Sequence, residues 1–82
     1  MYQPVHEEIE VIGVFAKGCF TPKKFLWNKR VINIEQITLS SLVKDGGVRN
    51  RFYSALNQGN LYRLNYNLDT QHWQLAEVWY EG

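Results

Sequence analysis

The chain contains 82 residues, the size of one small domain, and its single cysteine, Cys19, excludes an internal disulfide. Its hydrophobic content of 45% favours a folded core over disorder, and its net charge of +1 by itself implies no polyanionic partner. No apolar run approaches the roughly 18 residues of a membrane span, and the N-terminus lacks the features of a signal peptide. We therefore expect one cytoplasmic domain, residues 1–82, with no membrane partner and with its thiol in a reducing compartment.

The first third of the chain is expected to contain an arm and two strands. Residues 1–7 are predicted to form a flexible arm. Residues 8–16 are rich in β-branched side chains and almost continuously apolar, which predicts a strand buried on both faces. A second, short strand is predicted at residues 23–28. Pro22 lacks an amide hydrogen, so it suits the start of that strand or a sheet edge.

Residues 30–40 carry the most ambiguous pattern. Their β-branched side chains are stiff and favour a strand. Asn33 followed by Gln36 resembles a capping box, and Gly46 would suit the C-cap of a helix. We favour the strand, with a helix over residues 33–44 as the alternative.

The second half of the chain predicts a meander of three strands, at residues 48–56, 61–67 and 72–80. Apolar and polar side chains alternate there with a period of two residues, as in half-buried strands. Glycine-containing turns at residues 45–47 and 58–60 separate them. The predicted fold class is therefore all-β, a small antiparallel meander or partly closed barrel of five or six strands.

Four spaced patterns carry a resemblance to a known family: Pro22-x-x-Phe25-x-Trp27-x-x-Arg30, Arg49-x-Arg51-x-Tyr53, Tyr62-x-Leu64 and Trp73-x-Leu75-x-x-Val78. In this order, over about residues 11–79, the chain resembles the small uncharacterised bacterial β proteins of the domain of unknown function 6504. The resemblance implies an all-β domain and supplies no activity and no functional residue.

The sequence offers little for catalysis or metal binding. Its only histidines, His6 and His72, lie in the predicted arm and beside a turn, and Cys19 is far from both in the sequence. That spacing matches no zinc site, and nothing marks the acid or oxyanion hole that a Cys–His nucleophile pair needs. We therefore expect no enzyme activity, no metal and no cofactor.

Positive charge is concentrated in the middle of the chain. Residues 17–63 hold all nine Lys and Arg residues and only two acidic ones, Glu35 and Asp45. Small β-barrels bind single-stranded nucleic acid by stacking bases on aromatic side chains inside a positive groove. Arg49 and Arg51 would share a strand face with an exposed Tyr53. The candidate nucleic-acid-binding residues are Lys24, Arg30, Arg49, Arg51, Tyr53 and Arg63.

Two alternatives weaken that hypothesis. The acidic ends of the chain can fold beside the basic middle and cancel its field. The aromatic residues that interleave with the basic ones can also be core residues, and we favour this interpretation for Phe25, Trp27, Phe52, Tyr62 and Tyr66.

The function class predicted from these observations is a non-enzymatic interaction or self-associating module. Its partner would be another protein or a second copy of the chain, bound through aromatic residues that one small barrel cannot bury. Trp79 and Tyr80 are the candidates, because the last strand could pair with another chain at an open edge. Weak binding of single-stranded nucleic acid is the alternative.

Overall fold

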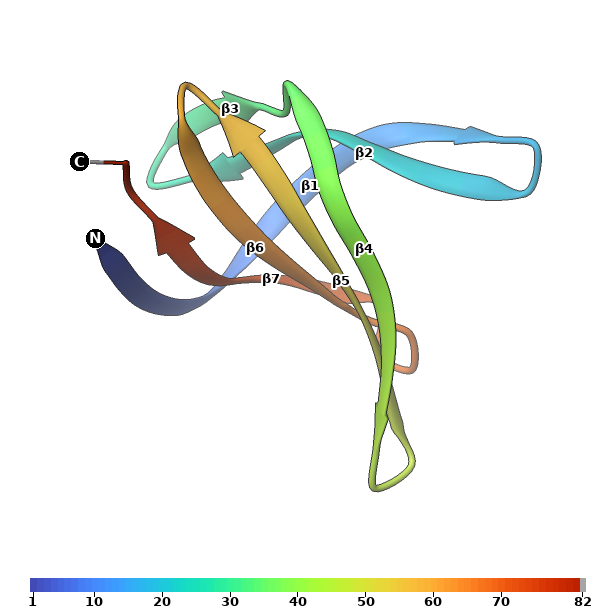
Figure 1. Ribbon diagram of the computed structural model, residues 1–82. Helices are drawn as coiled ribbons and strands as arrows, with labels where there is room; N and C mark the ends of the chain where they lie inside the picture. The colour runs from blue at the N-terminus through green and yellow to red at the C-terminus, as the bar shows by residue number, and fades with distance from the viewer. Residues whose placement is uncertain (82) are drawn as a thin grey trace.

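The computed structural model describes residues 1–81 as one antiparallel sheet, and no helix occurs among them. Its seven strands are β1 (Tyr2–Ala16), β2 (Cys19–Trp27), β3 (Arg30–Asn33), β4 (Gln36–Asp45), β5 (Val48–Asn57), β6 (Asn60–Asn67) and β7 (His72–Trp79). Their order in the sheet is β3-β2-β1-β7-β6-β5-β4, and the sheet curves into a half-barrel (Figure 1). The all-β prediction is confirmed, with seven strands instead of five or six. The described chain contains no helix with the length and hydropathy needed to cross a membrane.

The additional strand comes from the ambiguous segment. Residues 30–40 are strand and not helix, but the strand breaks at Ile34 and Glu35, between β3 and β4. The Ile34 amide donates to the Lys23 carbonyl on β2, and the Glu35 amide donates to the Leu56 carbonyl on β5, both at 2.8 Å. Two consecutive residues thus connect β2, near one edge of the sheet, with β5, near the other edge. This connection closes one end of the half-barrel.

The N-terminal segment differs from the predicted arm. Tyr2 pairs with Trp79, so residues 2–7 belong to β1 and extend along β7. The irregular register between Pro4 and Glu7 contains His6, which has a φ of 54°. Further along, β1 leaves β7 after Ile9 and pairs with β2 alone. This change of neighbour lets a 15-residue strand take part in both the body of the sheet and a projecting hairpin.

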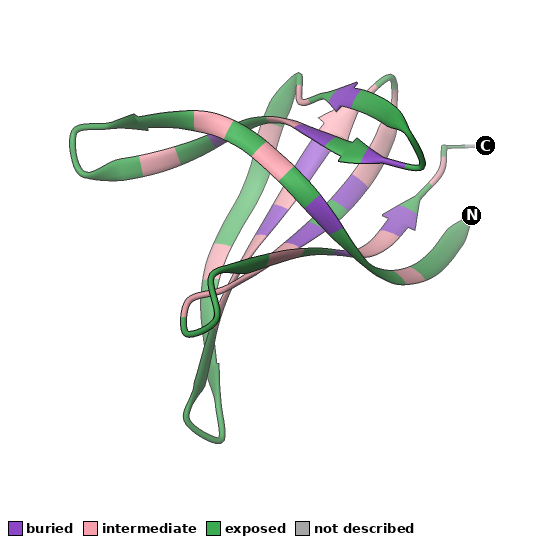
Figure 2. Cartoon of the chain, turned by 180° about the vertical axis from the view of Figure 1, so that it is seen from behind, coloured by how far each residue is buried: buried purple, intermediate pink, exposed green. Residues whose placement is uncertain are grey.

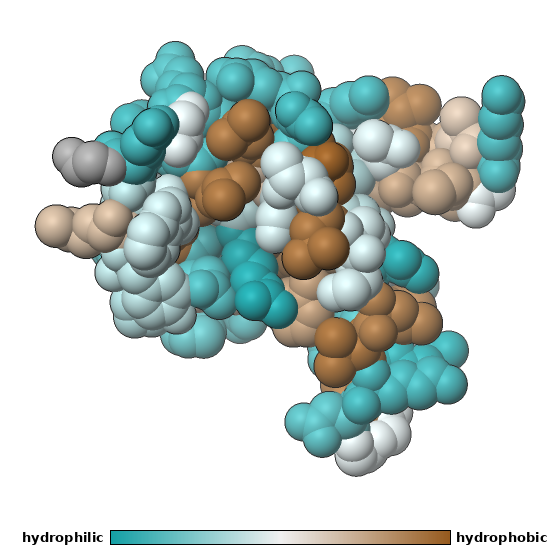
Figure 3. Space-filling model, in the orientation of Figure 1, coloured by the Kyte–Doolittle hydropathy of each residue, from teal (hydrophilic) through white to brown (hydrophobic). Residues whose placement is uncertain are grey.

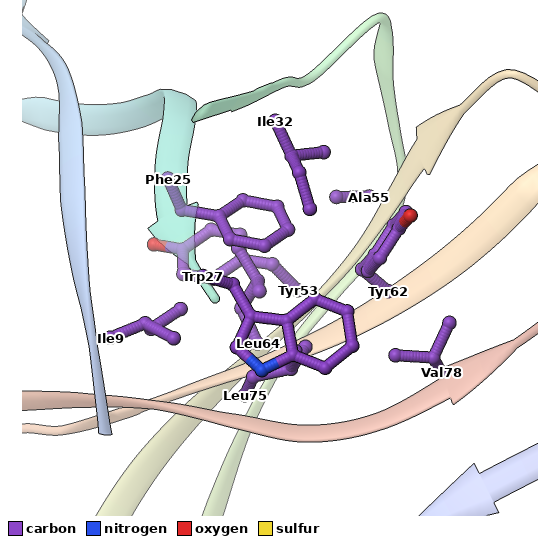
Figure 4. Packing of buried hydrophobic residues seen from close by; sticks show 10 residues of the cluster. All are labelled: Ile9, Phe25, Trp27, Ile32, Tyr53, Ala55, Tyr62, Leu64, Leu75 and Val78. Atoms are coloured by element: carbon purple, nitrogen blue, oxygen red, sulfur yellow. The ribbon is translucent and has the colours of Figure 1, made fainter. Parts of the chain in front are cut away.

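The core lies on the concave face of the sheet, towards its closed end (Figure 4). Phe25 and Tyr62 meet edge to face with ring centroids 5.4 Å apart, and Trp27 meets the same tyrosine at 6.4 Å. The core assignment is confirmed for these three residues, whereas Tyr66 is only half-buried. Phe52 instead lies on the opposite face of β5, where the Arg63 guanidinium sits 4.5 Å from its ring centroid. The buried hydrophobic residues are Ile9, Phe25, Trp27, Ile32, Tyr53, Ala55, Tyr62, Leu64, Leu75 and Val78.

Two hairpins project from this body and diverge from each other (Figure 1). We define the β1–β2 arm as residues 13–22 and the β4–β5 arm as residues 40–52. The ends of both arms are exposed (Figure 2). In the β1–β2 arm the register shifts after Ile12, and Pro22 then lies opposite Gly13. Lys23 is the residue left out of this register, and Pro22 lies beside the bulge where β2 pairs with β1 but not with β3. Its missing amide donor is tolerated there as at the sheet edge that the sequence suggested.

Candidate functional site

The two arms border a cleft of about 480 Å³ at the open end of the half-barrel. It exists because the sheet closes only at the Ile34–Glu35 end, so the arms are not paired with each other. Residues from six strands and two connecting turns line it: Phe15, Gly18, Cys19, Phe20, Ser40, Arg51, Tyr53, Tyr66, Leu68 and Trp73.

Trp73 is the centre of an aromatic cluster in this cleft. Its ring centroid lies 4.7 Å from that of Tyr66, 5.6 Å from that of Tyr53 and 5.9 Å from that of Phe20. All three contacts are tilted, a geometry that avoids face-to-face repulsion between the rings. The cluster therefore gives the cleft a rigid aromatic floor that draws on β2, β5, β6 and β7.

A glycine allows Phe20 to reach this cluster. A Cβ at Gly13 would lie only 2.6 Å from the Phe20 Cζ atom and would also clash with the backbone of Thr21 and Pro22. The Phe20 ring thus covers a position that only glycine can occupy, as aromatic side chains do beside strand glycines. Phe15, which is opposite Phe20 in the β1–β2 register, lies on the rim of the cleft and is 73% exposed.

Arg51 supplies the positive charge of the cleft. It lies opposite Tyr66 in the β5–β6 register and shares the concave face with Tyr53. Burial raises the pKa of the Tyr53 hydroxyl, and the positive charge of Arg51 partly offsets that rise. Within residues 1–81, Arg51 has no ion pair, whereas Arg49 and Arg63 each have one.

The structure brings together only two of the six predicted nucleic-acid-binding residues, Arg51 and Tyr53. Tyr53 is 8% exposed, so the expectation of an exposed stacking platform at this position is wrong. Arg49 instead forms an ion pair with the turn before β7, where its Nη2 atom lies 3.1 Å from Asp69 Oδ1.

The remaining three predicted residues point elsewhere. Lys24 pairs with Ile12 on the convex side of the β1–β2 hairpin, out of phase with buried Phe25. Arg30 lines a separate polar pocket at the closed end. Arg63 lies on the convex face, 3.8 Å from Glu77 Oε1. The basic middle of the chain therefore does not form a single face.

Sequence reasoning missed the four aromatic residues that complete the cleft: Phe15, Phe20, Tyr66 and Trp73. Their assembly depends on β2, β6 and β7 meeting across the sheet, which no local pattern reveals. One local signal was available, because a glycine inside a strand marks a close approach by another group. Gly13 carries that signal, because two aromatic residues, Phe15 and Phe20, follow it on the two sides of a turn.

A second candidate site is the free edge of β4. This ten-residue strand is the last in the sheet order and pairs only with β5. Three of its apolar side chains are exposed: Leu39 at 59%, Leu42 at 46% and Val43 at 40%. Hydrophobic side chains colour part of the β4–β5 arm in the space-filling view (Figure 3). A long, exposed and apolar edge strand is a template for pairing with another chain.

The predicted edge at Trp79 and Tyr80 is wrong. β7 is an interior strand that pairs with β1 on one side and β6 on the other. The Tyr80 amide donates to the Met1 carbonyl at 2.7 Å, so the N-terminal half of β1 occupies the edge that another chain would need. Because residues 1–7 were predicted to lie outside the sheet, the last strand was expected to have a free edge.

Comparison of the chain with protein-family models, with curated proteins and with solved structures finds no match. The resemblance to the domain of unknown function 6504 therefore stays a prediction. Across residues 1–81, no group of three or more His, Cys, Asp or Glu residues is arranged to hold a metal ion.

Proposed function

We propose that the protein is a non-enzymatic, self-associating module in which the β4 edges of two copies pair antiparallel. The observation that carries this proposal is the unpaired ten-residue edge of β4 with its three exposed apolar side chains. The exposed thiol of Cys19 and the absence of a disulfide suit a reducing compartment, so the proposal includes a cytoplasmic location.

The sequence of β4 favours one register between the two copies. A two-fold axis perpendicular to the joined sheet keeps each residue on its own face, so opposed residues must share a face. A register centred on Ser41 places Leu39 opposite Val43 of the second copy, and it does so twice. Leu42 then faces Ser40 on the concave side, and Lys44 faces Thr38. No pair of like charges is brought together.

The neighbouring registers are less favourable. Centring the pair on Ser40 places Leu39 opposite Ser41, and centring it on Leu42 places Val43 opposite Ser41. Each alternative loses both Leu39–Val43 pairs, which contribute roughly 0.2–1 kcal/mol each. Centring on Leu42 offers only one Leu42–Leu42 pair in return, and centring on Ser40 sets Val43 opposite Ile37, which lies beyond the bulge in β4 and packs against the core. One strand pair buries less area than the roughly 1,200–2,000 Å² of a stable interface. We therefore expect a weak dimer that forms with increasing concentration.

Analytical ultracentrifugation over a wide concentration range tests the proposal. The wild type is expected to shift from monomer to dimer. The double substitution Leu39→Lys and Val43→Lys should abolish this shift, because it sets lysines opposite each other across the two-fold axis. A matched control is Ile12→Lys with Val14→Lys, which also replaces exposed apolar residues, 61% and 51% exposed, on the convex side of β1.

Two results would reject this assignment. A wild type that stays monomeric at the highest concentration would rule out self-association. A dimer that survives the β4 double substitution, with circular dichroism showing an intact fold, would place the interface elsewhere.

A further inference from the structure

We propose that the cleft between the two arms binds single-stranded nucleic acid, with a base against its aromatic lining and a neighbouring phosphate at Arg51. This site is independent of the β4 edge. Neither Leu39 nor Val43 lines the cleft, to which β4 contributes Ser40. The proposal thus adds a ligand to a face that self-association leaves open.

The size and lining of the cleft suit a planar ligand. Its volume of about 480 Å³ falls within the roughly 300–1,000 Å³ of small-ligand pockets. Phe15 and Phe20 border it on the β1–β2 arm, and Tyr66 and Trp73 border it on the sheet. Every nucleobase has a π face, so stacking against such rings binds bases with little sequence preference.

The exposure of the rings indicates which of them a base can reach. Phe15 is 73% exposed and presents most of its ring to solvent, and Phe20, Tyr66 and Trp73 are half-buried. Tyr53 is buried beneath them and supports the floor without offering a free face. The stacking role predicted for Tyr53 therefore passes to Phe15 on the rim and to the half-buried rings beside Trp73.

The charge around the cleft is complementary to phosphate. The two arms carry four basic residues, Lys17, Lys44, Arg49 and Arg51, and one acidic residue, Asp45. Asp69 engages Arg49 through two hydrogen bonds, to its guanidinium and to its backbone amide. Arg51 has no such partner within residues 1–81, and a guanidinium is well suited to bind phosphate. It is therefore the cation available beside the aromatic floor.

A single strand fits this arrangement better than a duplex does. In a duplex the bases are stacked on each other and paired, so their faces cannot reach side chains at the floor of a cleft. In a single strand the bases can turn inward while the backbone runs along the positively charged arms. Residues of both arms line the cleft and the arms are not paired with each other, which leaves room for the strand to enter and leave.

Tryptophan fluorescence provides the test, because Trp73 is the tryptophan that lines the cleft. In a Trp79→Phe background, a ten-nucleotide oligothymidylate is titrated at two salt concentrations, in parallel with thymidine monophosphate. We expect quenching by the oligonucleotide, with an affinity that falls as salt rises because counterions are released. The mononucleotide should bind more weakly, since it contacts one position only.

The variants separate charge from stacking. Arg51→Ala should lower the affinity about tenfold and flatten the slope of log affinity against log salt by about 0.7. Arg63→Ala is its matched control, because that arginine lies on the convex face and pairs with Glu77; its binding should equal that of the wild type. Phe15→Ala should lower the affinity about tenfold and leave the salt slope unchanged. Its exposure predicts an intact fold.

Several outcomes would overturn the proposal. One is the absence of binding at low salt by a protein that circular dichroism shows to be folded. Another is binding that both Arg51→Ala and Phe15→Ala leave unchanged. A mononucleotide that binds as tightly as the oligonucleotide would indicate a site for single nucleotides and not for a strand. A ten-residue polyglutamate that binds as tightly would show that the site recognises negative charge alone. The β4 double lysine variant should still bind, so failure of one proposal is distinguishable from failure of the other.

Discussion

The closed and open ends of the half-barrel share most of their strands and the same alternating pattern, yet one end forms a core and the other a cleft. At the closed end, Ile34 and Glu35 bond to β2 and β5, and Asn57 Nδ2 donates to the Asn33 carbonyl at 2.7 Å. At the open end the arms are not paired with each other. The β1–β2 arm is a two-stranded ribbon on which Phe15 is 73% exposed, and the β4–β5 arm bonds instead to the turn before β7, where the Leu68 amide donates to the Arg49 carbonyl at 2.9 Å. Alternation therefore decides which residues face inward, and closure of the sheet decides whether those residues become core.

The free edge of β4 follows from the same incomplete closure. Only the beginning of β4 lies next to the link from β3, and the remainder runs out along the arm. A full barrel would have covered this edge. The cleft and the proposed interface are thus two consequences of one structural feature.

Trp27→Ala should break the closed end and unfold the protein most strongly. The residue is 7% exposed, packs on Tyr62, and donates from Nε1 to Glu7 Oε1 at 3.3 Å. Removing a buried tryptophan costs about 3–5 kcal/mol of unfolding free energy. Urea denaturation provides the measurement, and Trp79→Ala is the control because that side chain is 53% exposed. Equal losses in the two variants would contradict the assignment of the core to this end.

Gly13→Ala should damage the open end and leave the closed end folded. The added Cβ would meet the Phe20 ring and the backbone of Thr21 and Pro22. Overpacking of this kind costs about 1–3 kcal/mol. Hydrogen exchange should show faster opening of amides in the β1–β2 arm and little change around Leu64 on β6. Uniformly faster exchange throughout the sheet would show that the arm and the body unfold as one unit.

Much of the closed end was predictable from the sequence. The three strands after Val48 were located to within a few residues, because alternation and glycine turns mark them clearly. Phe25, Trp27 and Tyr62 were assigned to the core for the same reason, since large rings at alternate positions need a common buried face. These are local properties, and local patterns determine them.

The features that set strand order and the shape of the half-barrel were not predictable, because they depend on contacts between distant parts of the chain. No glycine or proline marks the break at Ile34 and Glu35, so one strand was expected where two exist. The pairing of Tyr2 with Trp79 joins the two ends of the chain, and no local pattern reveals it. An irregular register in the β6–β7 pair also places Val78 in the core, whereas Trp79 is exposed. Without strand order, Arg51 could not be separated from the other basic residues.

The smallest expected effect concerns the tie between the β4–β5 arm and the turn before β7. The Arg49 guanidinium and backbone amide both donate to the Asp69 carboxylate, and these hydrogen bonds lower the pKa of that carboxyl below its ordinary value. A carboxyl whose pKa is lower in the folded state contributes stability above its unfolded pKa of about 4. That contribution is lost as the pH falls through the folded pKa.

Substitution Arg49→Gln should therefore return the pKa of Asp69 towards its ordinary value, which an NMR titration of the carboxyl group would detect. Arg63→Gln should leave it unchanged, because Arg63 pairs with Glu77 on the convex face. The stability difference between wild type and Arg49→Gln should be small at neutral pH and should vanish in acid, since both side chains of the pair are exposed to screening by solvent and salt. If the stability difference between wild type and Arg49→Gln persisted after Asp69 is protonated, Arg49 would act through packing within the arm. In that case this ion pair would not be what holds the β4–β5 arm to the body of the sheet.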